Sequence, residues 1–488
     1  MSKTPAGRDR FAGLDAVIRR ARRHWPVPGL AVAVVADGRT VLCRCFGRRD
    51  LKRDAPVTPQ TRFAIGSITK GFTATALGIL ADEGKLDWDR PVRDWLPDFR
   101  LVDAEAARRA TPRDLLCHRV GLGRHDNAWY GLRLDRRELL SRLRHLASAW
   151  PFRQRWGYQN MMFMIAGWLV ERIAGVPWAR FVRERICGPL GMDGVRFSPV
   201  DVAGEPNVAA AHAIRNGRAF GAATDTASEL GAAGSIWAGV ADMAQWLRLN
   251  LAGGSIDGRR IVRAATLRML HRPIIDVPEP VKWPELGRQR YALGWNVQSY
   301  RGRRTVWHAG LANGFLAECY LVPQANAGVV VLSNAMGHPV SKLVTYYLCD
   351  RLLGVRPAPW VTRMGRSWAQ MRQANAEHRQ AVRAEARAAA KDRPGSRPRP
   401  IRDFAGRYRN SGYGEIKIIR RGSRLMAEFA GIRHRLRRLG PESFEMNRPL
   451  WGAKDVLTFA ADCTGRFVRV SIPFESTTAP IVFRRVGP

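Results

Sequence analysis

The sequence predicts an α+β protein, in which an antiparallel sheet flanked by helices is followed by a small all-β barrel. Two observations predict the sheet: apolar runs on either side of Asp37-Gly38, and three strand-like runs between residues 304 and 334. Asp-Gly between two such runs is a strong hairpin signal. After residue 401, short alternating segments separated by Gly, Pro and Asn are typical of a small barrel or sandwich.

The other elements follow in order along the chain. Apolar residues at helical spacing predict a helix from about residue 11 to residue 24, which Pro26 ends. Thr111-Pro112-Arg113-Asp114 has the pattern of a capped helix start, with Thr111 as the N-cap and Pro112 at the first helical position. Further helices are predicted over residues 72–80, 161–173 and 240–247.

A change of composition between residues 357 and 400 marks a domain boundary. An Ala/Arg/Glu-rich helical segment is followed there by a stretch rich in helix breakers, from Arg393 to Pro400. We therefore predict a first domain over residues 1–355, a helical Arg/Ala/Pro-rich linker over 356–400 and a β-domain over 401–488.

Length and composition indicate a globular protein. At 488 residues, with 46% hydrophobic residues, the chain can form two or three domains with a substantial core. No stretch is apolar enough to span a membrane, and the first residues lead into a charged helix, so we expect a cytoplasmic protein. The seven cysteines are scattered without metal-ligand spacing to histidine. We expect reduced thiols, no metal and no cofactor.

The formal net charge of +38 would suit a nucleic acid or an anionic membrane as partner. The basic residues are spread along the whole chain, however, and no signature of a nucleic-acid-binding fold accompanies them. Nearly all basic residues are arginine, and lysine occurs at only a few positions, as a GC-rich genome would favour. We therefore expect neither a nucleic-acid partner nor a membrane partner.

The clearest chemical pattern is Ser67-Ile68-Thr69-Lys70, at the start of a predicted helix. Residues three apart share a helix face, so the Ser67 hydroxyl can meet the Lys70 amine. Serine needs an adjacent base to attack a carbonyl, and lysine serves when burial favours its neutral form. Lysine at 70 stands out in an arginine-rich chain because only lysine deprotonates readily. The alternative is a serine N-cap followed by a solvated lysine.

Two further motifs stand on a turn and on a strand. Tyr158 and Asn160 precede a long apolar helix, where both can point into a cleft; a packing anchor and a capping Asn are the alternative. His308-Ala309-Gly310 lies in a strand-like run. Glycine at 310 would let a substrate backbone approach the strand edge and pair as an added strand.

His118, His125 and Asp126 could be read as part of a metal site or a triad. No third metal ligand lies nearby in the sequence, and glycines separate the two histidines. We therefore expect structural or loop hydrogen-bonding roles for them.

Ser67-x-x-Lys70, Tyr158-x-Asn160 and His308-x-Gly310 follow one another in this order. In this the sequence resembles the serine β-lactamase and penicillin-binding-protein-like family, most closely its class C, esterase and D-aminopeptidase branch. The resemblance covers roughly residues 11–355 and implies a β-lactamase-like fold with a helical subdomain. Residues 401–488 resemble the lipocalin-like β-domain that is sometimes appended to such hydrolases.

The resemblance implies a role for each residue. Ser67 would be the acylated nucleophile, Lys70 its activating base and Tyr158 the acid/base that protonates the leaving group and activates the deacylating water. Asn160 would hold the substrate carbonyl or the Lys70 amine. The backbone N–H groups of Ser67 and Leu311 would form the oxyanion hole. A phenol near an ammonium has its anion stabilised, which suits the role given to Tyr158.

The third motif departs from the family pattern. β-Lactamases and transpeptidases usually carry Lys-Thr-Gly or Lys-Ser-Gly there, to bind the substrate carboxylate, whereas His308 is mostly neutral at pH 7 if unperturbed and Ala309 has no hydroxyl. We therefore expect a serine hydrolase that acts on a small ester, amide or short peptide, of the esterase or D-amino-acid peptidase/amidase type. His308 and Gly310 would lie on the substrate side. The alternatives are an acyltransferase, β-lactamase activity, and a self-assembling homo-oligomeric scaffold.

Overall fold

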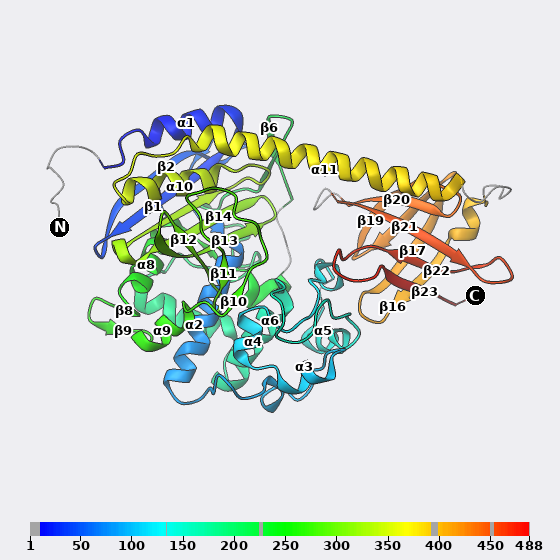
Figure 1. Ribbon diagram of the computed structural model, residues 1–488, viewed down its shortest axis with the longest axis horizontal. Helices are drawn as coiled ribbons and strands as arrows, with labels where there is room; N and C mark the ends of the chain where they lie inside the picture. The colour runs from blue at the N-terminus through cyan, green and yellow to red at the C-terminus, as the bar shows by residue number, and fades with distance from the viewer. Residues whose placement is uncertain (1–9, 133, 224–227, 392–398, 449–452, 488) are drawn as a thin grey trace. The chain divides into compact units, whose positions relative to one another are not determined.

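The computed structural model describes residues 10–487 except 133, 224–227, 392–398 and 449–452. The chain forms two compact units (Figure 1). The first contains the chain up to Pro97 together with Ala110–Arg119 and Asn160–Trp368. The second contains Asp98–Arg109, Val120–Gln159 and the chain from Ala369 onwards. The composition of the sequence did not indicate that residues 98–109 and 120–159 group with the C-terminal part.

A nine-stranded antiparallel sheet forms the centre of the first unit. Its order is β10-β11-β12-β13-β14-β15-β1-β2-β3. The strands are β10 (Ile275–Asp276), β11 (Arg290–Tyr291), β12 (Asn296–Tyr300), β13 (Arg303–Ala312), β14 (Phe315–Val322), β15 (Ala327–Ser333), β1 (Gly29–Ala36), β2 (Arg39–Asp50) and β3 (Ala55–Pro56). The predicted hairpin is confirmed: Asp37 and Gly38 both have positive φ angles, 50° and 74°, as a tight hairpin turn requires.

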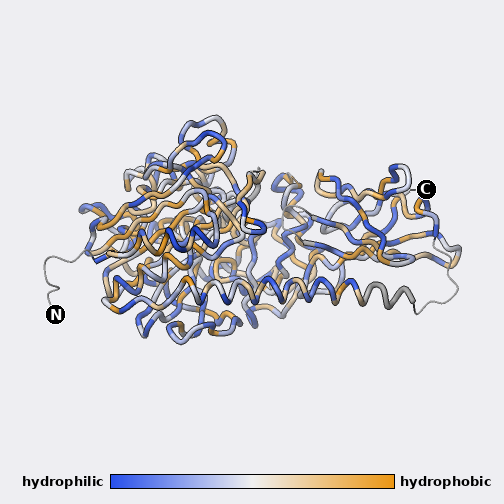
Figure 2. The backbone as a smooth tube through the Cα atoms, turned by 90° about the horizontal axis from the view of Figure 1, so that it is seen from above, coloured by the Kyte–Doolittle hydropathy of each residue, from blue (hydrophilic) through white to orange (hydrophobic). Residues whose placement is uncertain are grey.

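The N-terminal hairpin and the later meander meet in one sheet because β1 pairs with β15, with Val32 opposite Val331. Every residue of β1 is buried, since helices cover both faces of the sheet. Helices α1 (Leu14–His24) and α10 (Val340–Leu352) cover one face, and α8 (Val240–Leu251) covers the other (Figure 1). Figure 2 shows apolar colour along the strands of this sheet.

The remaining helices of the first unit carry the predicted site or pack around it. They are α2 (Thr69–Asp82), α4 (Pro112–Leu116), α6 (Asn160–Ala174), α7 (Trp178–Val182) and α9 (Ala264–Leu270), with short 3-10 turns η1 (Gly66–Ile68) and η6 (Ser228–Ala233). Small two-stranded sheets join β4 (Phe63–Ala64) to β7 (Trp237–Ala238), β5 (His212–Arg215) to β6 (Arg218–Gly221), and β8 (Ser255–Ile256) to β9 (Arg259–Arg260).

The predicted capped start of α4 is confirmed. The Thr111 hydroxyl accepts a hydrogen bond from the Asp114 N–H, and the Asp114 carboxylate accepts the Thr111 N–H at 2.9 Å. Asp114 is fully buried and also accepts a hydrogen bond from the Arg119 guanidinium at 2.5 Å. The Leu116 carbonyl at the end of α4 then accepts the Gly294 N–H, which ties this helix to the turn before β12.

The second unit contains a closed eight-stranded antiparallel barrel, which confirms the predicted all-β domain. Its strands follow one another in chain order and β16 closes on β23. They are β16 (Gly406–Asn410), β17 (Gly414–Arg421), β18 (Arg424–Phe429), β19 (Ile432–Arg438), β20 (Ser443–Arg448), β21 (Ala453–Ala461), β22 (Phe467–Ile472) and β23 (Ile481–Val486). Phenylalanine rings fill its core, with Phe404 packed against Phe444, Phe459 and Phe467.

The chain also forms the α-helices α3 (Ala104–Arg109), α5 (Arg136–Leu143) and the long α11 (Trp360–Lys391), which begins in the first unit and continues into the second. The helical part of the predicted linker is this last helix. The breaker-rich stretch at its end falls largely outside the described residues.

All seven cysteines are free thiols in the structure. Among the described residues, no cluster of three or more His, Cys, Asp or Glu side chains is suited to hold a metal ion. Within the same ranges, no helix combines the length and the apolar character needed to cross a bilayer.

Candidate functional site

Ser67 lies in the short turn η1, directly before α2. The preceding Gly66 has a φ of 51°, a left-handed conformation that favours glycine. The N-cap position of α2 is Ile68, so Ser67 does not cap this helix through its side chain. Lys70, one turn further on, is fully buried. The alternative of a capping serine followed by a solvated lysine therefore does not describe this segment.

The amine of Lys70 lies among three oxygen atoms. Its Nζ is 3.1 Å from the Ser67 Oγ. It also donates to the side-chain oxygen of Asn160 at 2.9 Å and to the carbonyl oxygen of Ala233 at 2.7 Å. These three contacts join residues from η1, the first residue of α6 and the last residue of η6.

This arrangement suits a base. The Asn160 and Ala233 oxygens can only accept, so each takes one N–H of the amine. A neutral lysine amine has two N–H groups and one lone pair, and the Ser67 hydroxyl lies within reach of that lone pair, at 3.1 Å. Complete burial favours the neutral amine over the ammonium. The Phe163 ring, whose centroid is 5.2 Å from Nζ, forms part of the surrounding wall.

Side chains of α2 hold the segment that supplies the Ala233 carbonyl. The Thr73 hydroxyl donates to the Ala232 carbonyl at 2.7 Å. The Thr69 hydroxyl accepts the backbone N–H of Ile236 at 3.2 Å. These two bonds flank Ala233 and fix its carbonyl toward the buried amine.

Strand β13 runs beside Ser67. Strand β12 begins at Asn296, opposite Trp307, so residues 308–312 extend beyond β12. The missing side chain of Gly310 leaves room for the carbonyl of Ile65: a Cβ added at Gly310 would lie 1.9 Å from that oxygen. We expected this room to serve a substrate backbone, and in the structure the chain's own segment before Ser67 occupies it.

The same packing brings the backbone N–H of Leu311 close to the nucleophile. A Cβ added at Gly66 would lie only 2.7 Å from the Leu311 nitrogen. The side chain of Leu311 is exposed, whereas its backbone is part of this close contact. Residue 311 therefore lies beside the residue that precedes Ser67, as an oxyanion hole built from both N–H groups would need.

His308 is buried next to this segment and is neutral. Its Nδ1 donates to the Ala309 carbonyl at 2.7 Å, so its Nε2 accepts the Tyr291 hydroxyl at 2.9 Å. Burial lowers the pKa of His308 to about 3. At neutral pH this side chain supplies no positive charge to a substrate carboxylate.

Aromatic rings link His308 back to the lysine. Tyr291 packs on His118 at 4.8 Å between ring centroids, and His118 packs on Phe163 at 5.2 Å. His118 is thus a buried structural residue, consistent with the role expected for it. Sequence reasoning did not select Tyr291 as a site residue, because no chemical motif surrounds it; its hydrogen bond to His308 reveals its place.

Tyr158 belongs to the second unit together with the loop that precedes it. The Arg124 guanidinium carbon lies 5.3 Å from the centre of the Tyr158 ring. The amide of the next residue, Gln159, donates to the carbonyl oxygens of Gly123 and Arg124 at 2.5 and 3.3 Å. A cationic side chain and two hydrogen bonds therefore hold the Tyr158-Gln159 dipeptide against residues 123–124.

A family model described as Beta-lactamase matches residues 14–349. The chain belongs to the β-lactamase family. The matched region contains Ser67, Lys70, Tyr158, Asn160 and the His308-Ala309-Gly310 segment.

Individual relatives are similar to this chain over different lengths. An unguisins hydrolase, ungD', from Aspergillus campestris is 31% identical over 364 residues, which cover 70% of this chain and 65% of that relative. Esterase EstB from Burkholderia gladioli is 33% identical over 200 residues, covering 38% of this chain and 51% of the esterase. The chain thus spans less than two thirds of the length of both relatives.

A solved structure supports the fold of both units. The octameric penicillin-binding protein homologue from Pyrococcus abyssi aligns over 97% of this chain and 99% of its own, with a TM-score of 0.62 and 21% sequence identity. At this identity the similarity concerns the fold: a β-lactamase-like unit and a C-terminal barrel.

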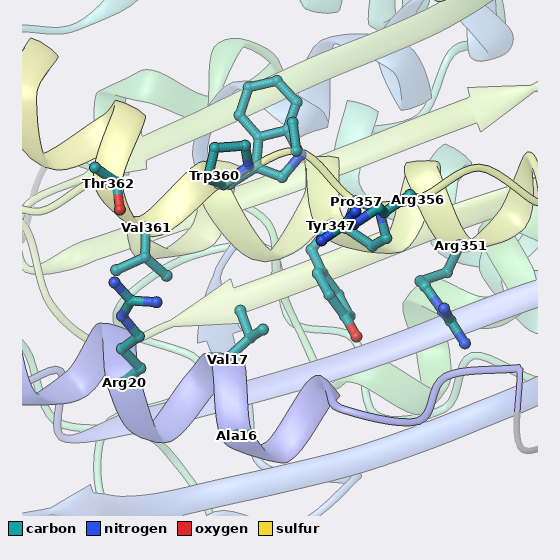
Figure 3. Close-up of a pocket in the computed structure, with 12 residues that line it drawn as sticks. Ala16, Val17, Arg20, Tyr347, Arg351, Arg356, Pro357, Trp360, Val361 and Thr362 are labelled. Carbon is teal, nitrogen blue, oxygen red and sulfur yellow. The ribbon is translucent and has the colours of Figure 1, made fainter.

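This β-lactamase-family chain also has a cavity of about 390 Å³ on the first unit, between α1 and the chain that joins α10 to α11 (Figure 3). Apolar side chains such as Val17 and Trp360 line it together with Arg20, Arg351 and Arg356. None of the predicted site residues lines this cavity, so it is separate from the candidate active site.

Proposed function

We propose that this protein is a serine hydrolase that acts through an acyl-enzyme at Ser67. Its substrate would be a small ester, an amide or a short peptide, as in the esterase or D-amino-acid peptidase/amidase branch of the family. One observation carries the proposal: the buried Lys70 amine lies 3.1 Å from Ser67 Oγ, with two acceptor-only oxygens satisfying its N–H groups. Membership of the β-lactamase family supports the same chemistry.

In the first half-reaction, Ser67 Oγ attacks the substrate carbonyl carbon while its proton passes to the Lys70 amine. The carbonyl oxygen becomes an oxyanion, which the N–H groups of Ser67 and Leu311 would stabilise. The intermediate then expels the alcohol or amine, which leaves with a proton, and the acyl group remains on Ser67. Asn160 holds the amine in place throughout.

In the second half-reaction, water attacks the acyl carbon and gives up a proton, and the carboxylic acid product leaves as Ser67 Oγ regains its own. We assign proton transfer to the leaving group and from this water to Tyr158. The adjacent Arg124 cation supports that role, because a positive charge near a phenol favours the phenolate. Tyr158 lies two residues before Asn160 in the chain.

The third motif supports the substrate class. His308 is buried and neutral, and both of its ring nitrogens have hydrogen-bond partners inside the protein. A substrate that depends on a carboxylate anchor at this position would find no cation. Esters and amides depend less on binding through a carboxylate. We therefore propose them, rather than β-lactams, as the substrate class.

Intact-mass spectrometry tests the proposal. Wild type, Ser67→Ala and the control Ser141→Ala, at an exposed position on α5, are each treated briefly with a fluorophosphonate, p-nitrophenyl acetate and a penicillin. We expect a covalent adduct on wild type and Ser141→Ala and none on Ser67→Ala. An adduct that persists in Ser67→Ala, or no adduct on any protein, would refute the proposal. The reagent that reacts distinguishes ester from β-lactam chemistry.

A further inference from the structure

Within the second unit, the loop between β16 and β17 reaches the segment that carries Tyr158. The Tyr413 hydroxyl lies 2.6 Å from His125 Nδ1, and the Ala147 carbonyl lies 2.8 Å from His125 Nε2. A carbonyl only accepts, so Nε2 carries the proton of a neutral imidazole. Burial lowers the pKa of His125 and favours this neutral form. Nδ1 is therefore an acceptor, and the Tyr413 hydroxyl donates to it.

The barrel loop is shaped for this contact. The Asn410 side-chain oxygen accepts the backbone N–H groups of Gly412 and Tyr413 at 2.8 and 3.0 Å. A Cβ at Gly412 would lie 2.6 Å from a methyl carbon of Leu146, so a side chain at position 412 would force the Leu146 side chain to move. The Tyr413 ring stacks on Phe474 with an interplanar angle of 16°. Its hydroxyl is thus held in one direction.

His125 needs this support. Its φ is 47°, in the left-handed region that a non-glycine residue rarely adopts. It is fully buried, so loss of the Tyr413 hydroxyl would leave a buried ring nitrogen without its donor. The conformation of the loop around His125 thus depends on a hydroxyl from the barrel.

The residue before His125 faces Tyr158. The Arg124 guanidinium lies over the Tyr158 ring and also donates to the Asp126 carboxylate at 2.5 Å. The Arg124 side chain is about half exposed; partial desolvation would lower its pKa, but the attraction of Asp126 and then of Tyr158 raises it above its ordinary value. The attraction between Arg124 and Tyr158 is mutual, so it also favours the phenolate. The Glu475 carboxylate also lies near Arg124 and raises its pKa further.

We propose that Tyr413 of the barrel is a positioning residue for Tyr158: by holding His125, it fixes Arg124 over the phenol ring and so sets the ionisation of Tyr158. The inference rests on the acid/base role given to Tyr158 above. It gives the C-terminal barrel a part in the reaction, since a contact more than two hundred residues away in sequence then controls a proton-transfer group.

The test compares Tyr413→Phe with Tyr408→Phe in the full chain. Both changes remove one buried hydroxyl from the barrel, but that of Tyr408 donates to the Phe404 carbonyl at 3.0 Å, inside the barrel. The substrate is p-nitrophenyl acetate, and kcat and KM are measured against pH. For Tyr413→Phe we expect kcat to fall about tenfold. The acidic limb of the plot of kcat against pH should shift to higher pH by about half a unit to one unit. KM and the Tyr408→Phe profile should not change.

Two further variants separate charge from packing. Arg124→Gln should move the acidic limb in the same direction, and Arg124→Lys, which keeps the positive charge, should restore it in part. A pH profile of Tyr413→Phe that matches wild type would overturn the inference, as would equal shifts in Tyr413→Phe and Tyr408→Phe.

Hydrogen–deuterium exchange provides a readout that does not depend on activity. Faster exchange at residues 123–130 is expected in Tyr413→Phe and not in Tyr408→Phe. Unchanged exchange there refutes the positioning contact, whatever the kinetics. If wild type forms no Ser67 adduct, the proposed function fails instead, while faster exchange in Tyr413→Phe would still support the link from the barrel to the Tyr158 loop.

Discussion

The carbonyl of Ile65 occupies the space that a side chain at residue 310 would need. A Cβ at Gly310 would lie 1.9 Å from that oxygen, a distance no pair of non-bonded atoms tolerates. Since Ile65 stands two residues before Ser67, the glycine of the third motif decides where the nucleophile lies. Leu311, the next residue of β13, lies against Gly66, where an added Cβ would be 2.7 Å from the Leu311 nitrogen.

Gly310→Ala should therefore displace the Ser67 turn. We expect a loss of about 1 to 3 kcal/mol in the free energy of unfolding, because the added methyl group overpacks a buried backbone contact. The rate of Ser67 labelling should fall by about 100-fold, since a displacement near 1 Å misaligns the nucleophile. Time-resolved mass spectrometry with a fluorophosphonate measures that rate.

The matched control is Gly221→Ala, where an added Cβ meets no atom within 4 Å. This variant should label like wild type. Equal rates for Gly310→Ala and wild type would show that the turn adjusts without cost, contrary to the expectation.

Asn160→Asp should change the pH at which Lys70 becomes active. The new carboxylate would lie 2.9 Å from the Lys70 Nζ and would stabilise the ammonium form. More alkaline solution would then be needed to form the neutral amine. We expect the acidic limb of the labelling rate to move up by about one pH unit or more. The control is Asn216→Asp, an exposed turn residue, and a profile that stays in place in Asn160→Asp would argue against Lys70 as the base.

Asp114→Ala should be among the more destabilising changes in the first unit. It removes the acceptor for Thr111 and leaves the guanidinium of Arg119 without its buried partner. We expect a loss of about 3 to 5 kcal/mol. Asp94→Ala breaks an exposed pair with Arg90 and should cost less than about 1 kcal/mol. Denaturant unfolding of both variants measures the difference, and similar values for the two would contradict it.

His338 should make the protein less stable in mild acid. Burial lowers its pKa to about 4, while its Nδ1 accepts the Val340 N–H and its Nε2 donates to the Ala335 carbonyl. In the unfolded chain a histidine titrates near pH 6.5, so between about pH 6.5 and pH 4 the unfolded state binds more protons. Stability therefore falls as pH falls through this window, by up to about 1.4 kcal/mol per unit.

His338→Gln should flatten this dependence in denaturation curves recorded at pH 7, 6 and 5. The exposed His24→Gln serves as control and should keep the wild-type slope. A His338→Gln slope equal to that of wild type would show that other groups account for the acid sensitivity.

Local signals in the sequence were enough for several parts of the molecule. The Asp37-Gly38 turn, the cap at Thr111 and the alternation of the barrel strands each depend on residues close together in the chain, and the structure confirms all three. The Ser67-Lys70 contact was predictable for the same reason, because a spacing of three fixes two side chains on one helix face.

Tertiary structure alone decided the partners of those residues. The Ala233 carbonyl that binds Lys70 is 163 residues away, and Tyr413 is 288 residues from His125. Such contacts produce no periodic pattern in the amino-acid sequence, because they depend on how separate segments pack and not on the geometry of one helix or strand. The sequence thus determined which groups could carry the chemistry; packing determined which groups hold them, because only the folded chain brings such distant residues together.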